Sequence, residues 1–389
     1  MNNLLKDTLA ERAAGAEPPP LDLDAIVAAG NRRISRRRAI GALGGAVAAA
    51  AVTIGTATVV RPRESQPQPA RPAPFAQRRV TYALGSTIHY GDELLSVAPH
   101  KITAFVQTDA GFVFLDAGNN IRVADRSGVR SLGKSSWELA ADFRGNLVGW
   151  VEGFDDHNES VVYDVAARRE LVRMAIGNQI PPNVSLVFRS RIIAIDGGTA
   201  YFDTVDGPYR WDIHANRGEL LAKVPTNTVR AVAAGQIVFQ SPLEQPHPGV
   251  SLAIGDSVSA TAPARFTGQR VFLSPGAKHL VAEPDDALPG IQPLWADLLM
   301  FDAATGKLNR MERTYLHAYF GQWHGDDTFT AAARRDNTAA AVADLLVVNA
   351  ATGAVKVAVP GFSTLTFSKT PPRITPFALP TGRPIVDLY

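Results

Sequence analysis

The chain has 389 residues, of which 46% are hydrophobic, so it can bury one large core or two ordinary ones and is not disordered throughout. It contains no cysteine, which excludes disulfides, thiolate metal sites and cysteine nucleophiles. Its net charge of +2 comes from the N-terminal part, because residues 75–389 hold 29 Lys and Arg against 31 Asp and Glu, which argues against a nucleic-acid-binding surface.

Residues 1–38 form a polar head. Leu4, Leu5 and Leu9 are spaced for a short amphipathic helix, and a second helical stretch is expected from Asp22 onward, after the prolines at 18–20. In composition and layout the head resembles those of single-span envelope proteins of actinobacteria. Two readings stay open, a docking segment for a cytoplasmic partner and a loosely ordered tail.

An uncharged run, Ala39 to Val60, follows five arginines between Arg32 and Arg38. A helix of that length spans roughly 33 Å, enough for a bilayer core of about 30 Å. The run is rich in Ala and Gly, so a buried helix of a soluble protein is the alternative. Because the arginines flank one end, the positive-inside rule favours insertion with the head inside. We therefore predict a transmembrane helix or uncleaved signal anchor over residues 39–60, crossing the plasma membrane once.

The segment Ser35-Arg36-Arg37-Arg38-Ala39-Ile40, followed by its Gly/Ala-rich run, resembles a twin-arginine export signal, whose pattern is Ser-Arg-Arg-x-Phe-Leu-Lys. Ala39 and Gly41 depart from that pattern at the Phe and Lys positions. The residues after the run, Arg61 to Glu64, offer no obvious cleavage site. Export by the twin-arginine route and export by the general secretory route both remain open.

Residues 61–74 alternate Pro with Gln, Arg and Ser, which predicts a stiff, extended linker. From Phe75 onward the apolar residues recur with a period of two, in short runs broken by Gly, Asp and Asn. That pattern is typical of short β-strands. We therefore expect an all-β domain over residues 75–389.

A unit of strand, tight turn and strand recurs through this domain. An Asp or Asn near the start of the turn can accept hydrogen bonds from turn amides, and a Gly often ends the turn because it adopts positive φ. The Asp or Asn positions of the seven copies are Asp92, Asp125, Asp164, Asp212, Asp256, Asp302 and Asn349. Copies about 35 to 50 residues apart have the spacing of β-propeller blades with four strands each.

The segment Val271 to Val281 resembles the Phe-Ser-Pro-Asp-Gly-Lys-x-Leu-Ala turn of TolB-type and related WD40-like propellers. Ser274, Pro275 and Lys278 match the pattern, whereas Gly276 and Ala277 replace its Asp-Gly pair. The resemblance covers residues 75–389 and implies a β-propeller. It implies little about activity, since propellers host binding, scaffolding and enzymatic roles alike.

The two ends of the domain are expected to share one blade. The hairpin Thr87–Val97 would supply two outer strands, and the segments 363–368 and 374–379 would supply two inner strands. Such pairing removes the free sheet edges that promote aggregation. The prediction is thus a seven-bladed propeller; six blades with a separate terminal hairpin is the alternative.

Loop lengths indicate where a partner binds. The turns between third and fourth strands are all expected to be short, whereas long connections between second and third strands occur at residues 152–159, 241–248, 283–295 and 334–337. These long connections would gather on one face, and loops on a rigid scaffold commonly carry function. The residues best suited to contact a ligand there are Phe154, His157, His247, Trp295, Arg334 and Arg335.

The sequence carries no motif of a known catalytic or cofactor-binding kind. His317 and His324 could face one another across a turn, with Asp326 and Asp327 nearby, and the pairs at 155–156 and 285–286 could attract a cation. We interpret all of these as ordinary surface residues, and expect no metal or cofactor.

The leading hypothesis is a membrane-anchored, non-enzymatic propeller that binds a protein, peptide or envelope glycan outside the cell. The alternative is a propeller-type hydrolase or lyase with a site at the central funnel. A third class, signalling across the membrane through the head, predicts that deletion of residues 2–30 leaves the propeller folded and removes a response. Nucleic acid is not an expected partner.

Overall fold

The structure is a computed structural model. It describes residues 73–152, 159–175, 190–204, 206–225, 227–241, 251–259, 265–268, 270–283, 298–334, 342–364 and 373–387. The chain divides into two compact units, Met1–Pro69 and Ala70–Tyr389. The predicted head and membrane span, and most of the predicted linker, lie outside the described residues. Within the described ranges, no helix has the length and hydropathy required to cross a bilayer.

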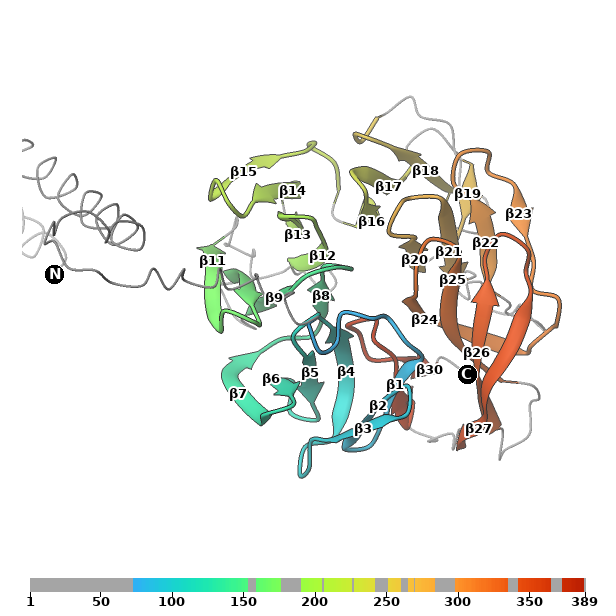
Figure 1. Ribbon diagram of the computed structural model, residues 1–389. Coiled ribbons are helices and arrows are strands. Elements are labelled where there is room, and N and C mark those ends of the chain that lie inside the picture. The colour runs from blue at the N-terminus through green and yellow to red at the C-terminus, as the bar shows by residue number, and fades with distance from the viewer. Residues whose placement is uncertain are drawn as a thin grey trace, which may run out of the picture. The chain divides into compact units, whose positions relative to one another are not determined.

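The second unit is a ring of seven four-stranded antiparallel sheets, the blades of a β-propeller (Figure 1). The first strand of each blade lies next to the central axis. Blade 1 contains β4 (Ile102–Gln107), β5 (Phe112–Asp116), β6 (Asn120–Asp125) and β7 (Gly128–Ser135). Blade 2 contains β8 (Leu139–Ala141), β9 (Leu147–Glu152), β10 (Glu159–Asp164) and β11 (Arg169–Ala175). Blade 3 contains β12 (Arg191–Asp196), β13 (Thr199–Thr204), β14 (Gly207–Asp212) and β15 (Arg217–Leu220).

The other half of the ring repeats this plan. Blade 4 contains β16 (Val229–Ala233), β17 (Gln236–Gln240), β18 (Ser251–Gly255) and β19 (Phe266–Thr267). Blade 5 contains β20 (Arg270–Leu273), β21 (His279–Glu283), β22 (Leu299–Asp302) and β23 (Leu308–Asn309). Blade 6 contains β24 (His317–Trp323), β25 (Thr328–Arg334), β26 (Val342–Asn349) and β27 (Val355–Thr364). The closing blade contains β29 (Phe377–Ala378), β1 (Thr81–Leu84), β2 (Thr87–Tyr90) and β3 (Glu93–Ser96).

The seven-bladed prediction is confirmed, and all seven sequence repeats join the third strand of a blade to its fourth. Asp302 and Asn349 show how the repeat works, because each carboxylate or amide oxygen accepts hydrogen bonds from the turn that follows it. Local side-chain chemistry therefore fixes these hairpins.

The hydrophobic core is divided among the junctions between blades. The described residues form seven clusters, one at each junction of the ring. Trp150, for example, is fully buried between blades 1 and 2, and Phe202 between blades 2 and 3. Because every blade packs on two neighbours, the ring has no end that exposes a blade face to water.

The expected division of the closing blade was wrong. The C-terminal part supplies only its innermost strand, β29, and the N-terminal part supplies the other three. The residues Thr81–Leu84 pair with β2 across a tight turn, and this strand was overlooked because it lies so close to the proline-rich linker. Ser363 instead belongs to the outer strand of blade 6, and Ile374 lies in β28 (Arg373–Ile374), which pairs with β30 (Val386–Asp387).

Between β29 and β30 the chain forms a strap, residues 379–385, that reaches the inner strands of blades 1 and 2. The Gly382 amide donates to the Phe105 carbonyl oxygen (2.9 Å), and the Leu139 amide donates to the Gly382 carbonyl oxygen (2.8 Å). Gly382 has a φ of +77°, and a Cβ there would lie 1.9 Å from the Leu139 oxygen. Only glycine fits so close an approach. The strap therefore adds a second link between the C-terminus and the start of the ring.

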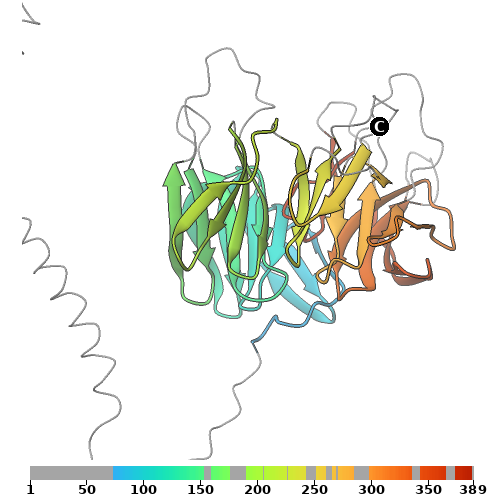
Figure 2. The ribbon, with the colours of Figure 1, turned by 90° about the horizontal axis from the view of Figure 1, so that it is seen from above.

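Alternation of strand direction gives the ring two different faces. We call the face that carries the first-to-second and third-to-fourth turns the turn face, which is the lower edge of the ring in Figure 2. The opposite face, the loop face, carries the second-to-third connections and the links between blades. One expectation about the turn face was wrong, since the third-to-fourth connection of blade 4 extends from Gly255 to Phe266 and is not short.

Candidate functional site

A central channel runs between the inner strands and has a cavity volume of about 240 Å³. Its wall is mostly apolar, formed by Val, Ile, Ala, Leu and Phe side chains of the inner strands. Two carboxylates, Asp142 and Asp196, are the acidic residues among its lining residues, and Arg78, Arg230 and Arg383 are the basic ones. These charged groups are the candidates for acid–base chemistry among the described lining residues.

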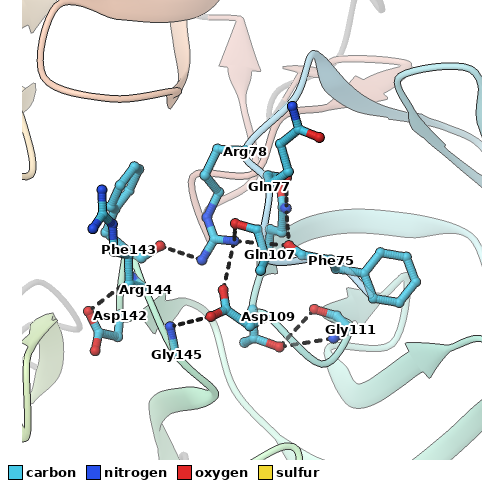
Figure 3. Close-up of polar contacts among 12 residues, drawn as sticks. Phe75, Gln77, Arg78, Gln107, Asp109, Gly111, Asp142, Phe143, Arg144 and Gly145 are labelled. Carbon is cyan, nitrogen blue, oxygen red and sulfur yellow. Dashed lines mark hydrogen bonds and ion pairs between the residues drawn. The ribbon is translucent and has the colours of Figure 1, made fainter. Parts of the chain in front are cut away.

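Arg78 ties the start of the domain to blades 1 and 2 at the turn-face end of the channel (Figure 3). Its Nη1 donates to Asp109 Oδ1 (3.0 Å) and to the carbonyl oxygens of Phe75 and Ala76, and its Nη2 donates to the Phe143 carbonyl oxygen. Burial lowers the pKa of Arg78, and the nearby Asp109 opposes that shift. Since arginine stays charged in proteins, this is a buried, hydrogen-bonded ion pair with a structural role.

A glutamine pair fills the same end of the channel. Gln107 Nε2 donates to the carbonyl oxygens of Phe75 (2.7 Å) and Gln77 (3.0 Å), and Gln107 Oε1 accepts from Gln322 Nε2 (3.0 Å). This contact joins β4 to β24, the inner strands on either side of the short β29. Among the described residues, the enclosed Gln322 Oε1 and Trp323 Nε1 have no hydrogen-bond partner.

Aspartates on the turn face bind main-chain amides of the following blade. Asp109 Oδ2 accepts from the Gly145 amide (3.0 Å), and Asp196 Oδ2 accepts from the Gly235 amide (2.8 Å). Asp142 accepts from the Gly197 amide. We call these three contacts the blade clasps. Because each clasp joins the first turn of one blade to the first turn of the next, the clasps hold neighbouring blades in register at this face.

A carboxylate–amide contact in the opposite direction, with the carboxylate on blade 6 and the amide on blade 5, involves the altered turn of blade 5. The Gly276 amide donates to Asp326 Oδ1 of blade 6 (2.5 Å), and a Cβ at Gly276 would lie 2.7 Å from that carboxylate. A residue with a Cβ at position 276, such as the aspartate of the TolB-type pattern, would therefore push the Asp326 carboxylate out of this contact. Ala277, which replaces the glycine of the pattern, has a φ of +54°. A side chain there costs conformational energy.

The two channel carboxylates are the strongest candidates for acid–base chemistry. Burial raises the pKa of Asp142, and the negative charge of Asp196 raises it further. A carboxyl group with a raised pKa beside a second carboxylate is a pattern found in sites of acid–base catalysis. Each of them, however, already serves in a blade clasp, so its oxygens are partly occupied by main-chain donors.

The loop-face end of the channel has different chemistry. Arg383 of the strap lies 2.7 Å from Glu138 in the link between blades 1 and 2. Trp137, the residue before Glu138, is 54% exposed. Farther out, Glu152 forms ion pairs with Lys134 (3.4 Å) and Arg173 (2.9 Å). This corner combines an exposed aromatic ring with fixed charged groups.

Of the six predicted ligand-binding residues, the structure describes only Arg334. Arg334 is the last residue of β25, pairs in register with His317, and is 5% exposed, so little of its side chain is available to a partner in this state. Phe154, His157, His247, Trp295 and Arg335 lie outside the described residues. The four long second-to-third connections that contain the predicted residues leave from strand ends on the loop face, as expected from their positions in the blades.

His317 and His324 do not face one another across a turn, because His317 begins β24 and His324 follows its last residue. His324 Nε2 instead lies 2.5 Å from Thr330 Oγ1, and burial lowers the pKa of His324 to about 4. The carboxylates at 155–156 and 285–286 are outside the described residues. No group of three His, Asp or Glu side chains suited to a metal ion occurs in the described ranges.

Sequence reasoning overlooked Arg78, Asp142, Asp196 and Trp137. The aspartates did carry a signal, since Asp196 ends a first strand and Asp142 directly follows one, each before a turn, but the search centred on third-to-fourth turns. Trp137 also carried one, because it is a bulky aromatic residue in a short polar link, Ser135 to Glu138. Arg78 had none, as it follows the linker among other basic and polar residues.

Comparison with family models gives no match, and neither does comparison with curated protein sequences. Similar solved structures include TolB from Acinetobacter baumannii, with 15% identity and a TM-score of 0.40 over 58% of this chain and 61% of that one. They also include a GH74 enzyme from Niastella koreensis, with 12% identity and a TM-score of 0.44 over 74% of this chain and 48% of that one.

A third similar structure is the β-propeller domain of the Trilobed protease from Pyrococcus furiosus, with 11% identity and a TM-score of 0.43 over 74% of this chain and 86% of that one. The chain thus spans about three-fifths of that TolB and about half of that GH74 enzyme. With overall similarity this low, the assignment to the propeller fold rests on the seven sheets and their closure.

Proposed function

We propose that the protein is a membrane-anchored binding module whose propeller lies outside the cell and captures a protein, peptide or envelope glycan through its loop face. The observation that carries this proposal is the asymmetry of the ring. Blade clasps join neighbouring blades on the turn face. On the loop face, the second-to-third connections of blades 2, 4, 5 and 6 are longer than those of the other three blades. A scaffold fixed on one side and elaborated on the other suits recognition.

Capture from cell-envelope extracts tests the proposal. The full chain is immobilised, and a variant carries alanine at Phe154, His157, His247, Trp295 and Arg335, the predicted contact residues outside the described strands. We expect wild type to retain a component that this variant loses, with the melting temperature unchanged. A matched variant has alanine at exposed turn-face residues, Lys278 and Asp327. Equal capture by wild type and the loop variant would contradict a role for the loop face.

A second candidate function is a hydrolase or lyase with its site in the channel. One observation favours it, the raised pKa of Asp142 beside Asp196. A broad panel of hydrolase and lyase substrates on the purified full chain tests this function, with Asp142→Asn and Asp196→Asn as variants. Turnover that both variants lose would establish the enzyme. Turnover unaffected by them, or none with any substrate, would exclude this channel site.

The location is part of the proposal. Five arginines precede residues 39–60 and only sparse ones follow, which supports a head inside and a propeller outside. An external protease on intact cells should digest the propeller and spare the head. If residues 75–389 are protected until the cells are lysed, the propeller lies inside the cell, and both the predicted orientation and the extracellular role are wrong. If the head also signals to a cytoplasmic partner, deletion of residues 2–30 should leave the propeller folded and abolish the cellular response to the captured ligand.

A further inference from the structure

We propose that the turn-face end of the central channel binds a small organic ammonium ion, with Asp142 and Asp196 as its counter-ions. The site lies away from the long connections of the loop face, so it goes beyond the proposed function and does not depend on it. Both aspartates line the channel, whose cavity volume is about 240 Å³. Pockets for drug-sized molecules are about 300–1,000 Å³, so this cavity suits a smaller ligand.

The two carboxylates lie at the same end of neighbouring inner strands. Asp196 is the last residue of β12, and Asp142 directly follows β8. Burial raises the pKa of Asp142, and the nearby negative charge of Asp196 raises it further. Two like charges in a partly dehydrated channel repel one another. A cation bound between them would relieve that repulsion.

Both carboxylates keep acceptor positions for a ligand. Each side chain is half-buried, so part of it is accessible. The Gly235 amide donates to Asp196 Oδ2 (2.8 Å). The amides of Arg144 and Gly197 donate to Asp142. An ionised carboxylate has about four lone-pair positions, so these bonds leave capacity on each aspartate. They also hold the carboxylates in place, which reduces the entropy lost when a ligand binds.

The charges at this end of the channel favour a cation. Arg78 is the basic lining residue there, and Asp109, 3.0 Å away, matches its charge (Figure 3). With Asp142 and Asp196, three negative charges therefore stand against one positive charge. Arg144 is exposed and is not among the lining residues. Because the channel wall is mostly apolar, this imbalance attracts a cation more strongly than it would in open water.

The other two basic lining residues are directed toward the loop face. Arg230 is the second residue of β16, and its Nη2 donates to Gln240 Oε1 (3.4 Å) at the loop-face end of β17. Arg383 pairs with Glu138 (2.7 Å) in the link between blades 1 and 2. Their positive charges are therefore at the opposite end of the channel from the proposed site.

The rest of the lining suits a ligand with a donor group and an apolar body. Gln322 lines the channel and is 8% exposed, and its Oε1 has no hydrogen-bond partner in the part of the chain that the structure describes. Its Nε2 already donates to Gln107 (3.0 Å), so an acceptor is left unused on this wall. Phe272 and Phe320, stacked with ring centroids 4.1 Å apart, also line the channel. They offer apolar surface to a short hydrocarbon chain.

Ligand-observed NMR titration of the full chain in a non-ionic detergent tests the inference. The probes are n-butylammonium, n-butanol and butyrate, which share a four-carbon body, and the buffer is phosphate because Tris is itself an organic ammonium. We expect n-butylammonium to bind at least about tenfold more tightly than n-butanol, and butyrate not to bind. Asp142→Asn and Asp196→Asn should each weaken binding of n-butylammonium at least about tenfold, because the amide oxygen can still accept the clasp but carries no charge.

Asp212→Asn is the matched control. Asp212 is an exposed turn-face aspartate that also accepts main-chain amides, but it does not line the channel. This variant should bind n-butylammonium like wild type.

Three outcomes would overturn the inference. Binding of n-butylammonium that survives both channel substitutions would place the cation elsewhere on the protein. Equally tight binding of n-butanol would make the channel an apolar pocket with no need for charge. The absence of saturable binding of n-butylammonium contradicts the site outright. Melting curves check that the variants are folded, and if one channel variant does not fold, the other variant and the three probes on wild type decide.

Discussion

On the turn face, neighbouring blades are joined by carboxylates that accept main-chain amides, as in Asp109–Gly145 and Asp196–Gly235. At the loop face of the junction between blades 1 and 2, Lys134 and Glu152 form an ion pair between side chains. A clasp to the main chain tolerates little movement, whereas a partly exposed ion pair is weak and adjustable. At this junction the main-chain clasp therefore fixes the turn face, and the ion pair leaves the side chains of the loop face more room to adjust.

The largest expected effect is at the buried Arg78. Replacement by Met leaves Asp109 without its cation and removes four donated hydrogen bonds. We expect the free energy of unfolding to fall by about 3 kcal/mol, the range for breaking a buried pair. Chemical denaturation measures it. Arg79→Met is the matched control, because that side chain is 40% exposed and its pair with Glu93 is worth at most about 1 kcal/mol. Equal losses in both variants would contradict the clasped turn face.

His324, beside the turn face, should make stability depend on pH. Its pKa is about 4 in the folded protein against 6.5 ordinarily, so the unfolded chain binds the proton first as pH falls. The contribution to stability is therefore complete above pH 6.5 and is lost between 6.5 and 4, by about 2 kcal/mol at pH 5.

The His324→Gln variant separates this effect from packing. Denaturation of wild type and variant at pH 7.5 gives the packing cost of the substitution. The difference between them should then shrink or reverse at pH 5, because the variant has no histidine to protonate. A difference that stays constant between the two pH values would show that His324 does not titrate in this range.

A smaller effect, and a gain, is expected at Ala277. Its positive φ is strained for a residue with a Cβ, so Ala277→Gly should raise the free energy of unfolding by about 1 kcal/mol. Ala351, whose φ is not positive, is the control, and Ala351→Gly should cost about 0.5 kcal/mol through the entropy of the unfolded chain. Thermal denaturation checks both signs. A loss in the Ala277→Gly variant would contradict backbone strain at Ala277.

The smallest effect is expected on the loop face. Trp137→Ala should change the free energy of unfolding by no more than about 0.5 kcal/mol, because the ring is exposed. Trp150→Ala, in the fully buried junction of the same two blades, should cost about 3–5 kcal/mol. Chemical denaturation of the two variants checks the contrast. A large loss at Trp137 would make it a packing residue.

The sequence by itself determined the blades. In five of the seven repeats, the Asp or Asn accepts hydrogen bonds from amides two or three residues further on, as Asp302 does from Thr305, so the pattern lies within about ten residues. Seven repeats at similar spacing predicted the seven-bladed ring, and strand order within each blade then predicted the face on which the long connections lie. A local pattern was sufficient because neighbouring strands in the blade are also neighbours in the chain.

Only the tertiary structure decided how the ring is closed and clasped. Gly382 is hydrogen-bonded to Phe105 through main-chain groups. Because every residue has a main-chain carbonyl group, no side-chain pattern could predict the strap. Gln107 and Gln322 are 215 positions apart, and Asp326 lies 50 positions from Gly276. These residues come into contact because the chain closes into a ring, which brings the inner strands and first turns of different blades together. For the same reason Asp142 and Asp196 became candidate functional residues only once their surroundings were known.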